Sequence, residues 1–172
     1  MRLLDLDESF SEPIRAILNH AIVTSTALYD YVPRPPEAMV GWFAAKRAGD
    51  FPVIGLVTDD GQLAGFASFG TFRAFPAYKY TVEHSVYVAE AFRGQGVARR
   101  LLTALIDRAE QQNKHTLIGV IDASNAASIR LHESFGFKLT GTLPQAGYKF
   151  GRWLDVCFYQ LLLETPTNPQ DG

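Results

Sequence analysis

A glycine-rich turn between an expected strand and an expected helix is the stretch best suited to hold phosphate. It spans residues 93–97 (RGQGV), and Arg99 and Arg100 follow in the helix. Glycine lets a backbone approach a ligand closely. The free N–H groups and partial positive charge of a helix N-terminus attract anions. Taken alone, the turn fits an ordinary strand-to-helix connection at least as well.

Two common phosphate-binding motifs do not match this turn. No Gly-Lys-Ser or Gly-Lys-Thr ends it, as a P-loop requires. A dinucleotide-binding fold needs an acid about 20 residues after the glycines, and the residue there is Lys114. Both classes are therefore disfavoured.

A carboxylate, Glu83, precedes the turn in an expected strand over residues 81–88. Period-two alternation puts Glu83 on one side of that strand and His84 on the other. Apolar neighbours would raise the pKa of Glu83 towards the range of a useful base. The alternative is a carboxylate held in a structural hydrogen bond. We interpret His84 as structural.

A mixed cationic and aromatic segment, residues 72–80, could recognise a small acid. It contains Arg73, Lys79 and four aromatic residues. Arginine pairs with a carboxylate through two hydrogen bonds, and aromatic rings enclose small pockets. A solvated loop with incidental aromatics is the alternative, and Lys79 is the weaker of the two cations.

Strands and helices mix along the chain. Strands are expected at residues 1–6, 52–57, 62–72, 81–88, 117–121, 137–143 and 153–163, and helices at 12–24, 37–48, 97–112 and 125–135. Asp60-Gly61 indicates a hairpin turn, and Val40, Phe43 and Ala44 share one side of the second helix. This order predicts an α/β (α+β) fold, with a mixed, mostly antiparallel sheet flanked by helices. We expect one domain over residues 1–164 and a flexible tail over 165–172.

Composition and charge narrow the class of protein. The 172 residues carry 16 Lys and Arg against 18 Asp and Glu, which argues against a general nucleic-acid binder. The single cysteine, Cys157, excludes a disulfide framework or Cys-rich zinc site within one chain, and we expect no metal. No signal peptide or apolar run long enough to span a membrane is present. A cytoplasmic protein with no membrane partner is the expectation.

Two motifs in this order resemble the GNAT superfamily of N-acetyltransferases. The first is Arg93-x-x-Gly96-x-Ala98, and the second is residues 125–137 (NAASIRLHESFGF). Residues 81–88 (TVEHSVYV), residues 147–153 (GYKFGRW) and the Asn19-His20 pair are similar to the phosphinothricin and methionine sulfoximine acetyltransferase branch. The similarity covers nearly the whole chain to about residue 163.

The resemblance implies a cofactor, acetyl-CoA, and positions for its contacts. The residues implied are Val86, Tyr87, Val88, Arg93, Gly94, Gln95, Gly96, Val97, Ala98, Arg99, Asn125 and Ser134. It also implies substrate contacts over residues 75–78. With the two cations, the substrate set is Arg73, Phe75, Pro76, Ala77, Tyr78 and Lys79. A small amino acid as substrate and a homodimer are implied as well.

Two residues, Glu83 and His132, are the catalytic candidates. An α-amine is mostly protonated near pH 7, so Glu83 would take its proton, directly or through water. A backbone N–H in residues 86–88 could stabilise the oxyanion. His132 occupies the position where many GNAT members carry a tyrosine acid, and a histidine is typical of this branch. Its role stays open between acid to the leaving thiolate and a group that orients substrate or base.

The function expected from the resemblance is acetyl-CoA-dependent N-acetylation of methionine sulfoximine or phosphinothricin. An acetyltransferase for another amino acid, amine or peptide is the alternative within enzymes. A non-catalytic acetyl-CoA sensor is the alternative from another class, because the phosphate turn would look the same there.

Overall fold

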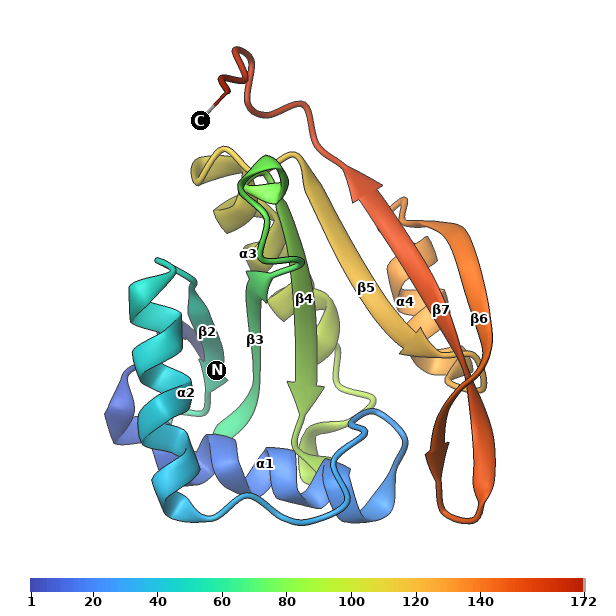
Figure 1. Cartoon of the computed structure of the whole chain (residues 1–172). Helices are drawn as coiled ribbons and strands as arrows, with labels where there is room; N and C mark the ends of the chain where they lie inside the picture. The colour runs from blue at the N-terminus through green and yellow to red at the C-terminus, as the bar shows by residue number, and fades with distance from the viewer. Residues whose placement is uncertain (172) are drawn as a thin grey trace. The chain divides into compact units, whose positions relative to one another are not determined.

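The computed structural model describes residues 1–171, and seven strands join in the order β1-β2-β3-β4-β5-β7-β6 (Figure 1). The strands are β1 (Arg2–Asp5), β2 (Val53–Val57), β3 (Leu63–Thr71), β4 (Thr81–Val88), β5 (Thr116–Asp122), β6 (Lys138–Lys149) and β7 (Arg152–Leu162). The helices are α1 (Ser11–Thr24), α2 (Pro36–Ala48), α3 (Val97–Gln111) and α4 (Ala126–Glu133). Strand β4 pairs with β5 in parallel, whereas β1–β2, β2–β3, β5–β7 and β6–β7 are antiparallel. The predicted mixed, mostly antiparallel sheet is confirmed.

The chain forms two compact units. The first consists of residues 1–70 and 85–107, and the second of residues 71–84 and 108–172. Strand β4 contributes its first half to the second unit and its last half to the first. No helix of residues 1–171 has the length and apolar content that crossing a bilayer requires.

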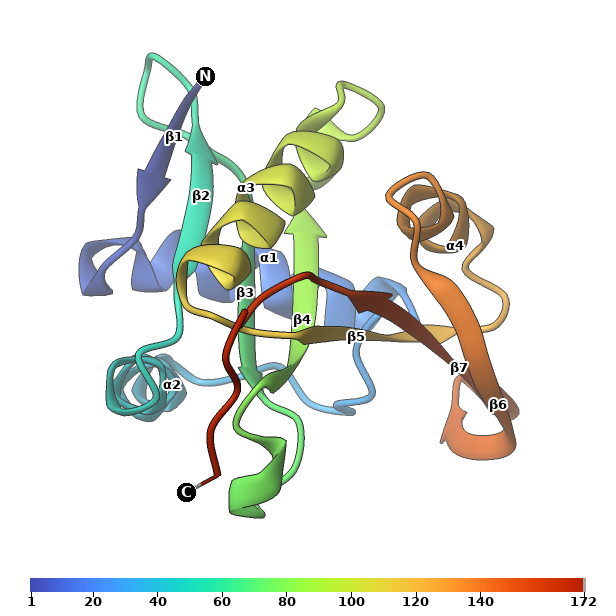
Figure 2. The ribbon, with the colours of Figure 1, turned by 90° about the horizontal axis from the view of Figure 1, so that it is seen from above.

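The first unit is a set of strands with helices on both faces. Helices α1 and α2 cover one face and α3 the other (Figure 2). The predicted apolar side of α1 is confirmed, since Ile14, Ile17 and Leu18 are buried against Phe66 in one cluster. Burial of such a side chain stabilises a fold by about 1.5–3 kcal/mol, so this face fixes α1 on the strands.

Helix α2 buries a different side from the one expected. Met39 and Phe43 are buried, whereas Val40 is 71% exposed and Ala44 is exposed. The helix begins at Pro36. It contains few apolar residues, so their spacing in the sequence is compatible with either of two neighbouring sides of the helix being buried. The β2–β3 hairpin is confirmed: Gly61 takes a φ of 88° and its N–H donates to the Thr58 carbonyl.

The second unit consists mainly of β5, β7 and β6 with α4. Strand β6 extends to Lys149, six residues beyond the predicted end. It passes through Pro144. Its pairing register with β7 shifts at two places, between Leu139 and Gly141 and between Leu143 and Gly147. Proline is tolerated at a sheet edge, where its missing N–H faces no neighbour. β6 is such an edge strand.

The turn between β6 and β7 has two residues, Phe150 and Gly151, with φ of 51° and 72°. Two positive φ values in a row match the twist of a hairpin, and Asn-Gly or Asp-Gly is the usual sequence there. Phenylalanine is an uncommon choice for the left-handed region, so this turn could not be predicted from its residue types.

The segment after β7 makes hydrogen bonds within the second unit. Thr165 donates its hydroxyl to the Lys114 carbonyl, and Tyr80 Oη lies 3.0 Å from the Gln170 N–H that donates to it. Gly172, the last residue of the predicted tail, lies outside the described residues. The domain boundary at residue 164 stays a prediction.

Candidate active site

The glycine turn lies in the first unit at the start of α3. Gly94 and Gly96 have φ of 75° and 77°, a conformation that favours glycine. A Cβ at either position would meet no atom of residues 1–171 within 4 Å, so the turn is open on that side. The Arg100 N–H donates to the Gly96 carbonyl and closes the first turn of α3. This arrangement leaves N–H groups at the helix start free for an anion.

The side chains around this turn differ in how free they are to contact a bound phosphate. Gln95 donates to the Ala91 carbonyl at 3.0 Å, which fastens the turn to its own preceding segment. Arg93 and Arg99 are exposed, Ala98 is half-buried and Val97 is buried under the helix. Arg100 reaches the Met1 carbonyl at 3.2 Å. By their exposure, Arg93 and Arg99 are both placed to add charge for a phosphate, and Arg93 lies within the turn itself.

The last residues of β4 pack tightly against β3 in the first unit. Val86, Tyr87 and Val88 are all half-buried, and the Tyr87 ring lies 5.4 Å from that of Phe66. The Ala89 N–H donates to the Ala64 carbonyl. Gly65 permits this approach, since a Cβ there would lie only 2.6 Å from the Tyr87 carbonyl oxygen.

The variant Gly65→Ala should lower the free energy of unfolding by about 1–3 kcal/mol, because the added methyl group overpacks the site. It would also press on Val97 and Leu101, at 3.1 and 3.2 Å. Urea denaturation measures the change. The matched control is Gly41→Ala on α2, where a Cβ meets open space. Equal stability of the two variants would contradict the tight β3–β4 packing.

Glu83 lies on β4 in the second unit, on the opposite side from buried Val82 and His84. This confirms the predicted alternation. Its carboxylate makes no hydrogen bond or ion pair with any part of the described chain, residues 1–171. The side chain reaches solvent but is partly enclosed, and this burial raises the pKa of Glu83. The carboxylate is thus accessible, unengaged and more basic than an ordinary glutamate.

His132 is buried in the last turn of α4, where both ring nitrogens have neighbours. Nδ1 lies 2.7 Å from the Ser128 carbonyl oxygen, and Nε2 lies 2.9 Å from Nε2 of His84. Burial lowers the pKa of His132. The histidine is therefore built into the second unit rather than exposed on its surface.

The two remaining predicted cofactor contacts lie at opposite ends of α4. Asn125 is the N-cap and its Oδ1 accepts from the Ser128 N–H at 3.1 Å. Ser134 is the C-cap and its hydroxyl donates to the Leu131 carbonyl at 2.6 Å. At 1.5 Å per residue, the two are about 13 Å apart along the helix. They suit contacts with different parts of one long molecule.

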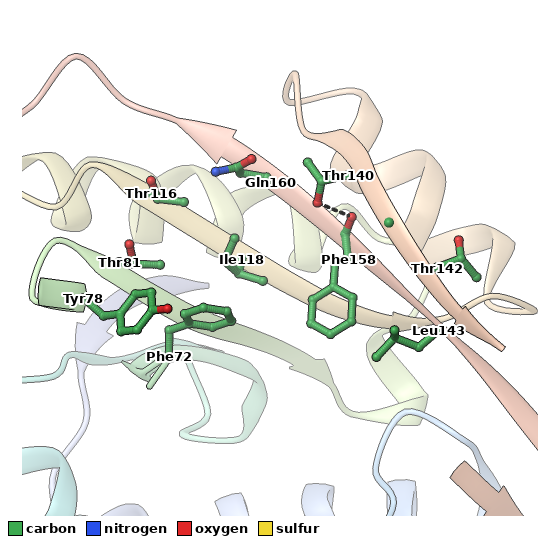
Figure 3. A pocket seen from close by; sticks show the side chains of 11 residues that line it. Phe72, Tyr78, Thr81, Thr116, Ile118, Thr140, Thr142, Leu143, Phe158 and Gln160 are labelled. Atoms are coloured by element: carbon green, nitrogen blue, oxygen red, sulfur yellow. Dashed lines mark hydrogen bonds between the residues drawn. The ribbon is translucent and has the colours of Figure 1, made fainter. Parts of the chain in front are cut away.

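A pocket of about 430 Å³ lies within the second unit (Figure 3). The rings of Phe72 and Tyr78, with centroids 5.7 Å apart, form one end, and Thr142 and Leu143 lie at the other. The remaining lining residues are Thr81, Thr116, Ile118, Thr140, Gly141, Phe158 and Gln160. Hydroxyls, one amide, aromatic rings and the aliphatic side chains of Ile118 and Leu143 make up this wall.

Of the six predicted substrate residues, Tyr78 lines the pocket. Arg73, Phe75, Pro76, Ala77 and Lys79 are absent from its wall among the described residues. The Arg73 guanidinium lies 5.6 Å from the Phe72 ring, and Lys79 Nζ lies 5.1 Å from the Tyr80 ring. Phe75 is 71% exposed. The pocket residues from β5, β6 and β7 were not predicted from the sequence. The alternation of side chains within each strand was the one signal that could have indicated which residues share the face of the pocket.

Comparison with known proteins identifies the family. The sequence model of the Acetyltransferase (GNAT) family matches residues 16–137. The chain belongs to this family. An L-methionine sulfoximine/L-methionine sulfone acetyltransferase of Salmonella typhimurium is 42% identical over 163 residues, which cover 95% of each protein. The expected GNAT domain and its acetyltransferase class are thereby confirmed.

Solved structures extend this result to the fold. A structure from Acinetobacter baylyi ADP1 has a TM-score of 0.98 and 56% identity, covering 99% of this chain and 96% of that one. A GNAT phosphinothricin acetyltransferase from Sinorhizobium meliloti, solved in complex with AcCoA, has a TM-score of 0.94 and 30% identity, covering 99% and 94%. The acetyltransferase resemblance therefore holds along nearly the whole chain.

Proposed function

We propose that this GNAT enzyme transfers the acetyl group of acetyl-CoA to the α-amine of a small amino acid, methionine sulfoximine or phosphinothricin. The observation that carries the proposal is the Glu83 carboxylate, which is accessible, has a raised pKa and has no partner within residues 1–171. A structural carboxylate would be engaged in a hydrogen bond. The similarity to acetyltransferases with these two substrates supports the choice of amine.

The glycine turn suits the pyrophosphate of acetyl-CoA. Gly94 and Gly96 would direct backbone N–H groups towards it, and exposed Arg93 would add a positive charge. The family resemblance supports Asn125 and Ser134, at the two ends of α4, as further contacts of acetyl-CoA. Acetyl-CoA supplies the acetyl group as a thioester when bound.

Glu83 would act as the base, directly or through one water. It removes a proton from the ammonium form of the substrate, and the neutral nitrogen then forms a bond to the thioester carbonyl carbon. A backbone N–H of Val86, Tyr87 or Val88 stabilises the oxyanion that develops. The C–S bond would then break, and the thiolate would leave with little help because the pKa of a thiol is about 8.5. The nitrogen would lose its second proton to water or to the departing thiolate, which gives the neutral amide.

The 430 Å³ pocket would hold the substrate side chain. Its wall, taken over the described residues, offers the hydroxyls of Thr81, Thr116, Thr140 and Thr142 and the amide of Gln160, and it contains no charged group. The pocket is partly open, so an anionic group there would lose only part of its water, but the wall offers no cation to compensate for that loss. The pocket therefore favours a neutral polar side chain, such as that of methionine sulfoximine, over the anionic phosphinate of phosphinothricin.

A substrate panel tests this proposal. We expect kcat/KM for methionine sulfoximine to exceed that for phosphinothricin by about tenfold, as an unpaired anion would cost roughly 1.4 kcal/mol or more. Release of CoA, followed by thiol detection, gives the rates. Methionine is the matched control, since it is similar in size but lacks the polar atoms on sulfur.

Each other outcome has a defined meaning. Faster reaction with phosphinothricin would show that this pocket does not select the side chain. Release of CoA with another amine alone would overturn the substrate proposal. A flat response to every amine, with acetyl-CoA still bound, would instead favour a sensor.

We also propose a cytoplasmic location and, from the family resemblance, a homodimer. The exposed aromatic residues Tyr148, Phe150 and Trp153, around the β6–β7 turn, give a surface that suits a second copy. Each subunit of this homodimer would bind a small amino acid as its substrate.

A further inference from the structure

A buried pair of imidazoles joins β4 to α4 within the second unit. His84 and His132 are 6% and 5% exposed, and their Nε2 atoms are 2.9 Å apart. Both rings also pack against Phe137, with centroids 5.2 and 5.0 Å away. His84 is the residue next to Glu83, but it points to the other side of the strand.

The neighbours of the pair assign its protons. Nδ1 of His132 lies 2.7 Å from the Ser128 carbonyl oxygen, which can only accept, so Nδ1 carries the hydrogen. Burial lowers the pKa of both rings, that of His84 to about 3, and both are neutral. Nε2 of neutral His132 is then an acceptor. Nε2 of His84 must donate to it.

The other tautomer of His84 is excluded by the same distance. With its proton on Nδ1, His84 would set two unprotonated Nε2 atoms 2.9 Å apart. In the assigned state, Nδ1 of His84 is unprotonated, and it is buried without a hydrogen-bond partner in residues 1–171. This unsatisfied atom costs free energy, which the hydrogen bond to His132 partly offsets.

A glycine makes room for the pair. Gly119 of β5 is in register with His84. A Cβ at Gly119 would lie 3.1 Å from both His132 Nε2 and His84 Cε1. Such contacts are tighter than most real packing, so a side chain at position 119 would require the two rings to shift by a few tenths of an ångström.

These contacts leave His132 without a free ring nitrogen. One nitrogen is bonded to Ser128 of its own helix and the other to β4. It therefore has no proton directed outwards for a leaving thiolate. The bond instead ties the last turn of α4 to the strand that carries Glu83.

We propose that His84 is a positioning residue, which donates to His132 and thereby holds α4 so that Asn125 and Ser134 can contact acetyl-CoA. The inference rests on the proposed function for the use of acetyl-CoA. It concerns the binding of that molecule, not the base or the acceptor amine. His132 acts through the same bond and is likewise a positioning residue.

The test compares two substitutions of His84. His84→Met keeps much of the volume and removes the donor. His84→Gln keeps an amide N–H near the position of Nε2. We expect KM for acetyl-CoA, and its Kd by calorimetry, to rise about tenfold in His84→Met and to recover to within about threefold in His84→Gln, with kcat nearly constant. Loss of folded protein alone would lower the apparent kcat and leave KM unchanged.

The unsubstituted protein provides a second measurement, by NMR with ¹⁵N-labelled histidine. We expect one protonated and one unprotonated nitrogen in each ring of the pair, and a scalar coupling between the two Nε2 atoms across the hydrogen bond. A proton on Nε2 of His132, or an unchanged Kd in both variants, would overturn the proposal. Failure of every amine in the substrate panel would overturn the proposed function instead, because calorimetry and NMR require no acceptor.

Discussion

The variant Glu83→Gln should lower kcat by about 10²–10⁴-fold, the range that a positioned base contributes. Glutamine has nearly the same size but cannot take a proton. Because no hydrogen bond or ion pair holds the Glu83 carboxylate within residues 1–171, little stability should be lost. KM for acetyl-CoA should stay within about twofold, since the phosphate turn is untouched. Steady-state release of CoA measures both constants.

The pH dependence gives this prediction a distinct signature. A base works only when ionised, and burial raises the pKa of Glu83. In the unsubstituted enzyme, kcat should therefore fall as the pH decreases through this raised pKa, at a higher pH than an ordinary glutamate, whose pKa is about 4.3, would give. The acidic limb should be absent in Glu83→Gln.

A matched control separates catalysis from a change of surface charge. Glu110→Gln removes the same charge from an exposed position on α3, and its kcat and pH profile should match those of the unsubstituted enzyme. If Glu83→Gln behaved like Glu110→Gln, another group would have to serve as the base.

The variant Gly96→Ala should raise KM for acetyl-CoA by about 10–100-fold, with a smaller effect on kcat. A φ of 77° costs a residue with a Cβ roughly 1–2 kcal/mol. Relief of this strain would rotate the N–H groups away from the phosphate position. The Cβ itself would meet no atom of residues 1–171, so a clash within the protein would not explain the effect. Calorimetry with CoA measures the loss directly.

Gly41→Ala is the control for this prediction as well. Gly41 lies within α2, where a Cβ meets open space, and alanine favours a helix over glycine by about 1 kcal/mol. Its affinity for CoA should be unchanged. Equal affinities of the two variants would remove the glycine turn from cofactor binding.

Features that depend on neighbours in sequence could be predicted. The apolar spacing of α1, the alternation around Glu83 and the Asp60-Gly61 hairpin follow from local geometry, and each is confirmed. The paired glycines of the turn do have positive φ values. In these cases one short segment contains all the information that its conformation needs.

Features that depend on residues distant in sequence could not be predicted from the sequence. The hydrogen bond between His84 and His132 could not be predicted, because the two residues are 48 positions apart in sequence. The pocket wall depends on the register of β5 with β7 and β6, which no single strand specifies. The turn between β6 and β7 could not be predicted, because Phe150 adopts a left-handed backbone conformation that is uncommon for phenylalanine.

The irregular course of β6 also bears on how copies of this chain could meet. An outer strand with regular, unpaired N–H and C=O groups invites another chain to continue the sheet, which leads to aggregation. Here Pro144 removes one donor and the two irregularities in register interrupt the spacing of the others. β6 is therefore a poor template for an added strand. A second copy that met this chain at β6 would have to dock through side chains, not by adding a strand at that edge.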